Sequence, residues 1–226
     1  MASTTTGVKT GPFGASEHVL DTVERVSEMC FGLFMALTFV GAVNAIGEEK
    51  QTGQAMFYTA LGCNLAWGLV DAVMYLVRTI TTRGKQLTLA LAVRHASDAA
   101  GGVHALREGL PAGLAAMLSD DELEPMRRRL LAAELPDRPR FHGRDIAGAF
   151  GIFLIVVATT FPVALPFVLF ADPKTGLLVS RGLTLVMLFG GGLALGRYAG
   201  YGTWRSGAAF VTLGVALTAA IIALGG

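Results

Sequence analysis

The stretch that most constrains the fold is the apolar run from Ala55 to Val77. It carries Asp71 inside it and is followed directly by Arg78. About twenty consecutive apolar residues are the length at which an α-helix crosses the hydrocarbon core of a bilayer. A carboxylate at that depth is costly, and intramembrane acids commonly mark a substrate or ion pathway. The sequence therefore predicts a membrane-spanning helix that carries a functional polar group.

The composition of the whole chain supports a membrane protein. Of its 226 residues, 53% are hydrophobic and only 15% are charged, and the mean hydropathy is +0.56. These values are too apolar for a typical soluble domain of this length. No small-residue cleavage site follows the first apolar run, so we expect that run to be retained.

Five segments have the length of a membrane span: residues 28–46, 55–77, 146–170, 177–195 and 208–224. Residues 1–15 are rich in Thr, Gly and Ser and are expected to form a disordered tail. Residues 16–27 place apolar side chains at helical spacing, which predicts an amphipathic helix that leads into the first span. We therefore divide the chain into a tail (1–15), an amphipathic helix with two spans (16–78), a polar insert (79–145) and three further spans (146–226).

The insert is too rich in charged residues to cross a bilayer, and its pattern predicts two helices. One is expected from Gly84 to Leu110, with a weak point at Gly101 and Gly102. The other begins at Ser119, because a serine followed three residues later by a glutamate is the signature of a capping box. Pro136 and Pro139 are expected to follow its end.

Small residues and prolines make two further predictions about the spans. Pro162 and Pro166 predict a kink in the third span, because proline removes a backbone hydrogen bond. The glycine series at 192, 196 and 200 predicts close packing of the fourth span against another helix.

The distribution of basic residues predicts the orientation. Fifteen of the eighteen Lys and Arg residues fall on the side of the membrane that holds the insert. Cytoplasmic loops carry an excess of these residues, so we expect the N-terminus and the insert in the cytosol and the C-terminus outside. The predicted fold is an all-α integral membrane protein with five transmembrane helices and a cytoplasmic helical insert between spans 2 and 3.

Five side chains that carry a polar group or a heteroatom follow helical spacing in the second span and define one face: Asn64, Trp67, Asp71, Met74 and Arg78. The carboxylate of Asp71, the amide oxygen of Asn64 and the thioether of Met74 form a mixed ligand set that suits Fe²⁺ or Mn²⁺ better than Ca²⁺. Glu28 and Met35 in the first span lie on one stripe and are expected to add ligands to this metal site.

Each candidate also has a structural interpretation that the sequence leaves open. Asp71 could pair with an arginine, and Asn64 could form a hydrogen bond between helices. Met35 and Met74 could fill the core, and Glu28 could be solvated at the edge of its span. The pairs His95–Asp98 and His104–Glu108 could each present two metal ligands, although a solvated helix surface is the more typical role.

The first two spans carry a resemblance to a known family. The segments ERVSEMCFGLFMALTFVGAVNA (24–45) and ALGCNLAWGLVDAVMYLV (60–77) resemble the opening of bacterial proteins assigned to the vacuolar iron transporter family. The third-span motif FPVALPF (161–167) and the insert between spans 2 and 3 are also similar to that family. The resemblance implies a homodimer in which the first spans meet at the axis, and export of Fe²⁺ or Mn²⁺ from the cytosol in exchange for protons.

Two functions are therefore expected from the sequence. The first is a proton-coupled exporter of Fe²⁺ or Mn²⁺ in the bacterial inner membrane, in which Asp71 or Glu28 alternates between protonated and metal-bound forms. The second is a non-transporting scaffold of the same fold whose arginine-rich insert recruits a protein or anionic lipid. No phosphate-binding loop, paired cysteine motif or nucleophile with a base is found in the sequence, so we expect no enzyme, no cofactor and no nucleic-acid partner.

Overall fold

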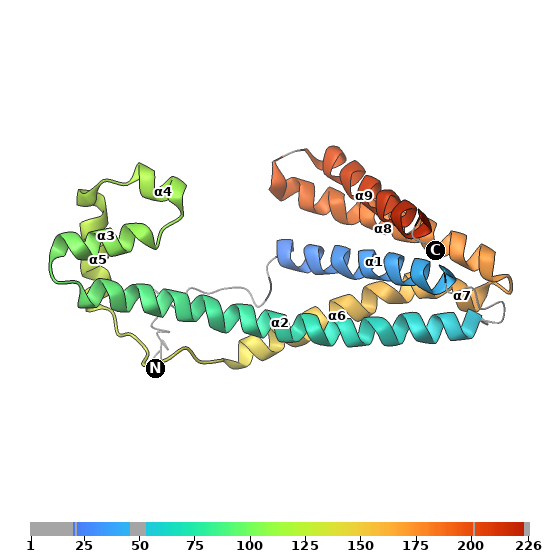
Figure 1. The fold of residues 1–226 in the computed structure, drawn as a ribbon, viewed down its shortest axis with the longest axis horizontal. Helices are drawn as coiled ribbons and strands as arrows, with labels where there is room; N and C mark the ends of the chain where they lie inside the picture. Colours follow the sequence, from blue (N-terminus) through green and yellow to red (C-terminus); the bar gives the residue numbers. More distant parts are fainter. Residues whose placement is uncertain (1–19, 21, 46–52, 201, 224–226) are drawn as a thin grey trace, which may run out of the picture. The chain divides into compact units, whose positions relative to one another are not determined.

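The computed structural model describes residues 20, 22–45, 53–200 and 202–223, and all the secondary structure it describes is helical. The predicted tail over 1–15, the beginning of the predicted amphipathic helix at 16–19 and most of the residues between the first two predicted spans lie outside these residues. The helices, labelled in Figure 1, are α1 (Thr22–Ala45), α2 (Gly53–His95), α3 (Ala99–Glu108), α4 (Ala112–Met117), α5 (Asp120–Ala132), α6 (Gly143–Ala164), α7 (Pro166–Leu169), α8 (Pro173–Ala199) and α9 (Thr203–Ala223).

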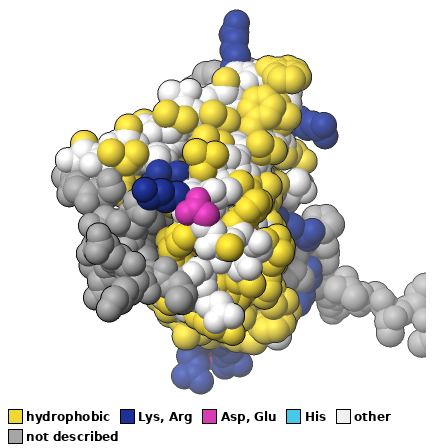
Figure 2. Space-filling view, turned by 90° about the vertical axis from the view of Figure 1, so that its right-hand side faces the viewer, with side chains coloured by type: hydrophobic (Ala, Val, Ile, Leu, Met, Phe, Trp, Pro, Cys, Tyr) yellow, Lys and Arg dark blue, Asp and Glu magenta, His cyan; other side chains and the backbone are white. Residues whose placement is uncertain are grey.

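Four of the described segments are long and apolar enough to cross a membrane. They are α2, the α6–α7 pair, α8 up to Tyr198, and α9. Exposed apolar side chains such as Leu69 and Val73 line the surface of α2, as expected for a lipid-facing helix. Most of the coloured side chains on the face drawn in Figure 2 are hydrophobic (yellow). These features indicate a multi-pass membrane protein, whereas the fifth crossing, which the sequence places in α1, stays a prediction.

The chain divides into two compact units. One contains the described residues 76–143, and the other contains the described residues of 19–75 and 144–226. The second unit holds most of the apolar helices and is called here the membrane unit. The first is called the polar unit.

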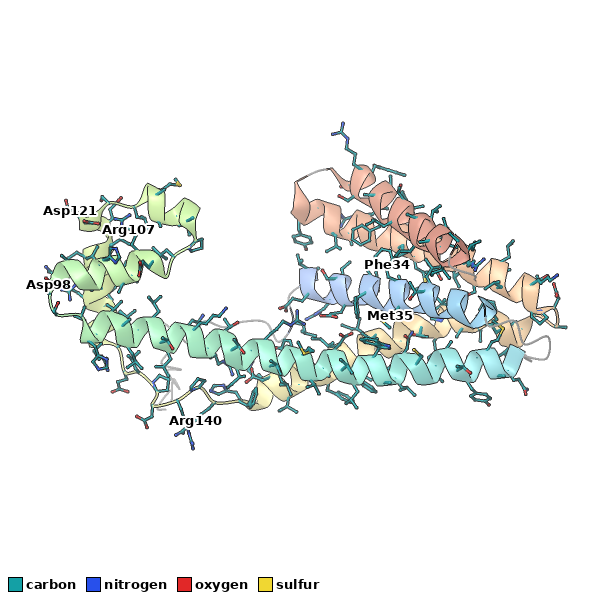
Figure 3. The ribbon with its side chains drawn as sticks, viewed as in Figure 1. Phe34, Met35, Asp98, Arg107, Asp121 and Arg140 are labelled. Carbon is teal, nitrogen blue, oxygen red and sulfur yellow. The ribbon has the colours of Figure 1, made fainter. Side chains whose placement is uncertain are left out.

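In the membrane unit, α1 packs against α8 and α9. Cys30, Leu33 and Leu188 are fully buried in one apolar cluster between these helices. On the same side of α1, the ring of Phe34 stacks on Phe210 with centroids 5.9 Å apart, and Figure 3 shows Phe34 directed toward α8 and α9. These contacts bury apolar area on one side of α1 and leave its other side for α6.

The prediction of close packing by glycine is confirmed at two of the three positions. A Cβ atom on Gly192 would lie 2.8 Å from the Cα atom of Gly207, and one on Gly196 would lie 2.8 Å from Thr203 Cα, so α8 and α9 are in backbone contact. For Gly200 the prediction is wrong. Gly200 is the C-cap of α8 with φ of +73°, a left-handed conformation that glycine adopts without steric cost.

The third span is interrupted at Leu165, just before Pro166, where α6 ends and α7 begins, and Leu165 keeps right-handed helical dihedral angles, so the predicted kink stays a prediction. Proline has no N–H group to donate, so carbonyls in the preceding turn need other partners. The hydroxyl of the buried Ser180 in α8 donates a hydrogen bond of 2.7 Å to the Val163 carbonyl at this break. A neighbouring helix therefore supplies a hydrogen-bond partner at this interruption.

The polar unit corrects one predicted helix and confirms another. The sequence placed a helix from Gly84 to Leu110, but α2 runs without interruption from Gly53 to His95 and the chain restarts as α3 at Ala99. The break lies at Asp98, whose side chain accepts a 2.7 Å hydrogen bond from the Gly101 N–H and so caps α3. Gly101 lies in the first turn of α3, so the predicted weak point was a few residues too late.

The predicted capping box at the start of α5 is confirmed. The Glu122 carboxylate accepts hydrogen bonds of 2.8 Å from both the backbone N–H and the hydroxyl of Ser119. The apolar face of α5 then supplies Leu123, which is fully buried against Val93, Val103 and Leu106. The polar unit therefore has a hydrophobic core of its own.

Candidate polar site between the membrane helices

On α2, every fourth residue from Met56 to Ala72 is buried, and the middle one is an asparagine. Met56, Ala60, Asn64, Gly68 and Ala72 are buried along this stripe. Asn64 is the polar member, and its residual exposure is 1%. A buried amide in an apolar helix is stable only if its donors and acceptors find partners.

The stripe packs against α6, which runs beside α2 in Figure 1. Gly68 of α2 leaves room for Phe153, whose ring would lie 3.2 Å from an added Cβ atom. Farther along, Gly148 of α6 leaves room for the phenol of Tyr75. The pairing of 64 with 160, 68 with 153 and 75 with 148 shows that the two helices run antiparallel.

Asn64 is held by Thr160 of α6. The Nδ2 amide group donates a hydrogen bond to the Thr160 hydroxyl, and that hydroxyl donates to the Val156 carbonyl at 3.0 Å. Because the Thr160 hydrogen is used on the backbone, the hydroxyl accepts from Asn64, and the amide must turn its NH₂ group toward it. The Asn64 Oδ1 atom consequently points elsewhere. It is buried and has no hydrogen-bond partner among the described residues.

A second hydroxyl lies one residue away on α6, where α1 approaches. A Cβ atom on Gly32 of α1 would lie 2.9 Å from Thr159 Oγ1, so a side chain at this position would push against the Thr159 hydroxyl. The Thr159 hydroxyl donates to the carbonyls of Ile155 and Val156, both at 2.9 Å. We call Asn64, Thr159 and Thr160 the polar seam, because these side chains lie where the apolar helices α1, α2 and α6 meet.

The residues predicted as one polar face of α2 do not share one environment. Asn64 is buried and Asp71 is half-buried, whereas Trp67 and Met74 are 42% and 47% exposed and Arg78 is also exposed. The buried stripe of α2 passes through Asn64 and Ala72, so Asp71 lies at its edge and Met74 on the outer surface.

The two predicted residues of α1 are both half-buried. Figure 3 shows Met35 on the side of α1 opposite to Phe34, away from α8 and α9. Glu28 lies seven residues before Met35, about two helical turns. The geometry therefore puts Met35 toward the seam side of α1.

Among the described residues, no group of three or more His, Cys, Asp or Glu side chains is close enough to hold a metal ion. In the polar unit, Asp98 caps α3, and His104 Nδ1 lies 3.9 Å from Glu108 with both side chains more than 70% exposed. These two pairs behave as a helix cap and a surface contact. A metal ligand set drawn from the described residues of one chain would have to include amide, hydroxyl or thioether atoms.

Several arginines of the polar unit have structural roles. Arg107 donates to the carbonyl of Leu118 at 2.7 Å and to the Asp120 carboxylate at 2.6 Å, which ties α3 to the start of α5. Arg94 donates to the carbonyl of Ala133 at 2.8 Å, beyond the other end of α5. These guanidinium groups hold the helices of the polar unit together.

The threonines of the polar seam were not identified from the sequence. Their signal was the pair Thr159–Thr160 inside the apolar run of the third span, directly before the Pro162 and Pro166 positions. A search of every span for hydroxyl and amide residues would have found them, together with the buried Ser180 and Thr184 of α8.

No family model matches this chain, and no curated protein matches it in sequence.

Proposed function

We propose that this chain transports a divalent transition metal, Fe²⁺ or Mn²⁺, out of the cytosol in exchange for protons. The observation that carries the proposal is the Asn64 Oδ1 atom, a buried acceptor without a hydrogen-bond partner among the described residues. Leaving such an acceptor unpaired in an apolar bundle costs about 1–3 kcal/mol. A cation that passes through the bundle would be its partner.

The spacing of the polar groups supports a transport path with more than one ion-binding site. Asn64 and Asp71 are seven residues apart on α2, which corresponds to about 10 Å along the helix axis. A single ion does not contact both at ordinary ligand distances of about 2 Å. In the proposed mechanism the Asp71 carboxylate binds the ion or a proton in alternation, and the Asn64 amide oxygen binds the ion within the seam.

The remaining ligands are proposed to come from α1 and from a second copy of the chain. Met35 and Glu28 are half-buried on α1, and Met74 is exposed on the outer surface of α2, where a partner subunit could cover it. The proposed assembly is a homodimer with five spans per chain, in the orientation that the basic residues predict. The resemblance of the first two spans to the vacuolar iron transporter family supports the same proposal.

A second candidate function is a scaffold that does not transport. The observation that favours it is that the polar unit builds its own core around Leu123 and exposes several arginines to solvent. In this case exposed arginines of the pocket described below, Arg138 and Arg140, would recruit a protein or an anionic lipid, and the membrane unit would serve as an anchor.

Metal flux into vesicles reconstituted with the purified protein distinguishes the two candidates. We expect uptake of Mn²⁺ driven by a pH gradient and its loss in the Asp71→Asn variant, because an amide at this position cannot exchange a proton for the ion. Ser180→Ala is the matched control, since Ser180 is a buried polar residue whose hydroxyl binds the backbone of α6.

The outcomes of this experiment separate the two candidates and test the role of Asp71. Flux by the wild-type protein alone excludes the scaffold that does not transport. Equal flux in Asp71→Asn and Ser180→Ala would remove Asp71 from the transport path, and no flux in any variant would favour the scaffold.

A further inference from the structure

The polar unit contains a pocket of about 370 Å³ between α2 and the segment that connects α5 to α6. One wall of the pocket is formed by α2 and the other by residues 135–142. The side chains that line the pocket include Arg83, Gln86, Leu87, Arg138, Arg140 and His142. All of them belong to the polar unit, so the pocket is formed within one compact body.

The two walls are joined by a direct hydrogen bond. The Arg83 Nη1 group donates to the backbone carbonyl of Arg140 at 2.9 Å. Pro136 and Pro139 also line the pocket, and proline fixes the φ angle of the backbone at both positions. The connecting segment is therefore held against α2 in a defined conformation even though it contains no helix.

The pocket is strongly basic. Three arginines and a histidine line it, and of the residues that the structure describes, no Asp or Glu does so. Arg138 and Arg140 are exposed, and neither forms an ion pair with a residue in the described part of the chain. Figure 3 shows Arg140 on the segment that leads into α6. These two exposed guanidinium groups are therefore placed to attract an anion.

The position of the pocket in the chain relates it to the membrane surface. Arg83 follows Val77, the last residue of the apolar run in α2, by six residues. His142 precedes Ile146, the first apolar residue of the next span, by four. Both walls therefore adjoin segments that enter the bilayer, and basic groups placed next to such segments meet the phosphates of lipid headgroups.

We propose that this pocket binds a phosphoryl group, carried by an anionic lipid headgroup or by free phosphate. The guanidinium group offers planar, paired N–H donors that match the oxygens of a phosphoryl group, and the two exposed arginines supply enough donors for all of them. The pocket volume falls in the range of ligand-binding cavities and leaves space beyond the phosphoryl group for the rest of a headgroup. This proposal does not depend on metal transport.

Titration of the purified full-length protein with two probes tests the proposal. One probe is short-chain phosphatidic acid and the other is inorganic phosphate, and the dissociation constants are measured by calorimetry in a detergent without phosphate. The double variant R138Q/R140Q removes two guanidinium groups from the pocket. The control R128Q/R129Q removes the same charge from α5, where Arg128 and Arg129 lie outside the pocket.

We expect R138Q/R140Q to weaken binding of the phosphoryl probe by about tenfold or more, since charge-assisted contacts are lost, and R128Q/R129Q to leave it unchanged. Binding of phosphatidic acid alone identifies a lipid site, whereas equal binding of both probes identifies a site for free phosphate. Equal weakening by the two double variants, or no binding of either probe by the wild-type protein, would overturn the proposal. Circular dichroism of each variant checks that the helices of the polar unit remain folded.

Discussion

At the scale of the residue, the orientation of the Asn64 amide depends on one hydroxyl. The Thr160 hydroxyl accepts a hydrogen bond from Asn64 Nδ2 and donates one to the Val156 carbonyl. Because the Val156 carbonyl fixes the orientation of the hydroxyl, the hydroxyl in turn fixes the orientation of the amide. At the end of this chain of hydrogen bonds lies the buried Oδ1 atom that we propose as an ion ligand. Thr160 is thus a positioning residue for Asn64.

Replacing Thr160 by valine tests this role. The valine keeps the shape of the side chain but removes the hydroxyl, so the buried Nδ2 group loses its acceptor and the protein is expected to lose about 1–3 kcal/mol of stability. We also expect lower metal flux, because the amide becomes free to turn. Thermal unfolding in detergent and flux in vesicles measure the two effects.

Thr160→Ser is the matched control, since it retains the hydroxyl and removes only a methyl group. It should keep most of the flux. If the valine and serine variants behave alike in both measurements, the hydrogen bond between Thr160 and Asn64 has no role in positioning the amide.

At the scale of the element, the contact between α8 and α9 depends on the absence of a side chain. A Cβ atom on Gly192 would lie 2.8 Å both from Gly207 Cα and from the Ser206 carbonyl oxygen. Both neighbours belong to the backbone of α9 and cannot move without shifting that helix. Close backbone approach of this kind gives membrane helices dispersion contacts where no hydrophobic driving force exists.

Gly192→Val is therefore expected to separate α8 from α9 and to destabilise the protein by about 1–3 kcal/mol. Gly190→Val is a matched control on the same helix, because no atom lies within 4 Å of a Cβ added at Gly190. Thermal unfolding of the detergent-purified variants measures the difference. Equal melting temperatures for the two variants would contradict the packing contact.

At the scale of the whole molecule, the polar and membrane units are expected to respond differently to acid. The Arg127 and Arg128 side chains bind the Glu124 carboxylate and lower its pKa from 4.5 to about 2. The backbone and hydroxyl of Ser119 also lower the pKa of Glu122. Both acids lie on α5, so the polar unit contains contacts that require charged carboxylates.

A carboxyl group whose pKa is depressed in the folded state stabilises the protein above the pKa of its unfolded state. For Glu124 this stabilisation is fully present above a pH of about 4.5 and is lost as the pH falls toward about 2. Hydrogen exchange at pH 3 should therefore show loss of protection in α5 before loss in the middle of α8. Glu124→Gln should weaken this pH dependence, whereas Glu134→Gln, beyond the end of α5, should not. Uniform loss of protection in both helices would contradict the prediction.

Much of the helical architecture follows from local chemistry. The apolar runs in α2, α6, α8 and α9 predicted four helices of spanning length, and Ser119 with Glu122 predicted the start of α5, because hydrophobic length and capping are properties of a few neighbouring residues. The break at Asp98 was missed because an aspartate in a polar helical pattern is also compatible with a helix surface. The roles of Gly196 and Gly200 illustrate the same limit, since identical residues four positions apart form a helix contact and a helix end.

The sequence by itself determined the helical class, the membrane-spanning segments and the polar unit between them in the chain, because crossing a lipid bilayer requires long apolar helices. It also singled out Asn64 and Asp71, because a polar side chain stands out within such an apolar helix. Only the tertiary structure decided which polar groups meet. Helical spacing placed Asn64, Asp71 and Met74 on one face, but the packing of α6 buries Asn64 against Thr160 and leaves Met74 exposed. The physical reason is that partners 96 residues apart in the chain are selected by helix packing, which no local pattern encodes.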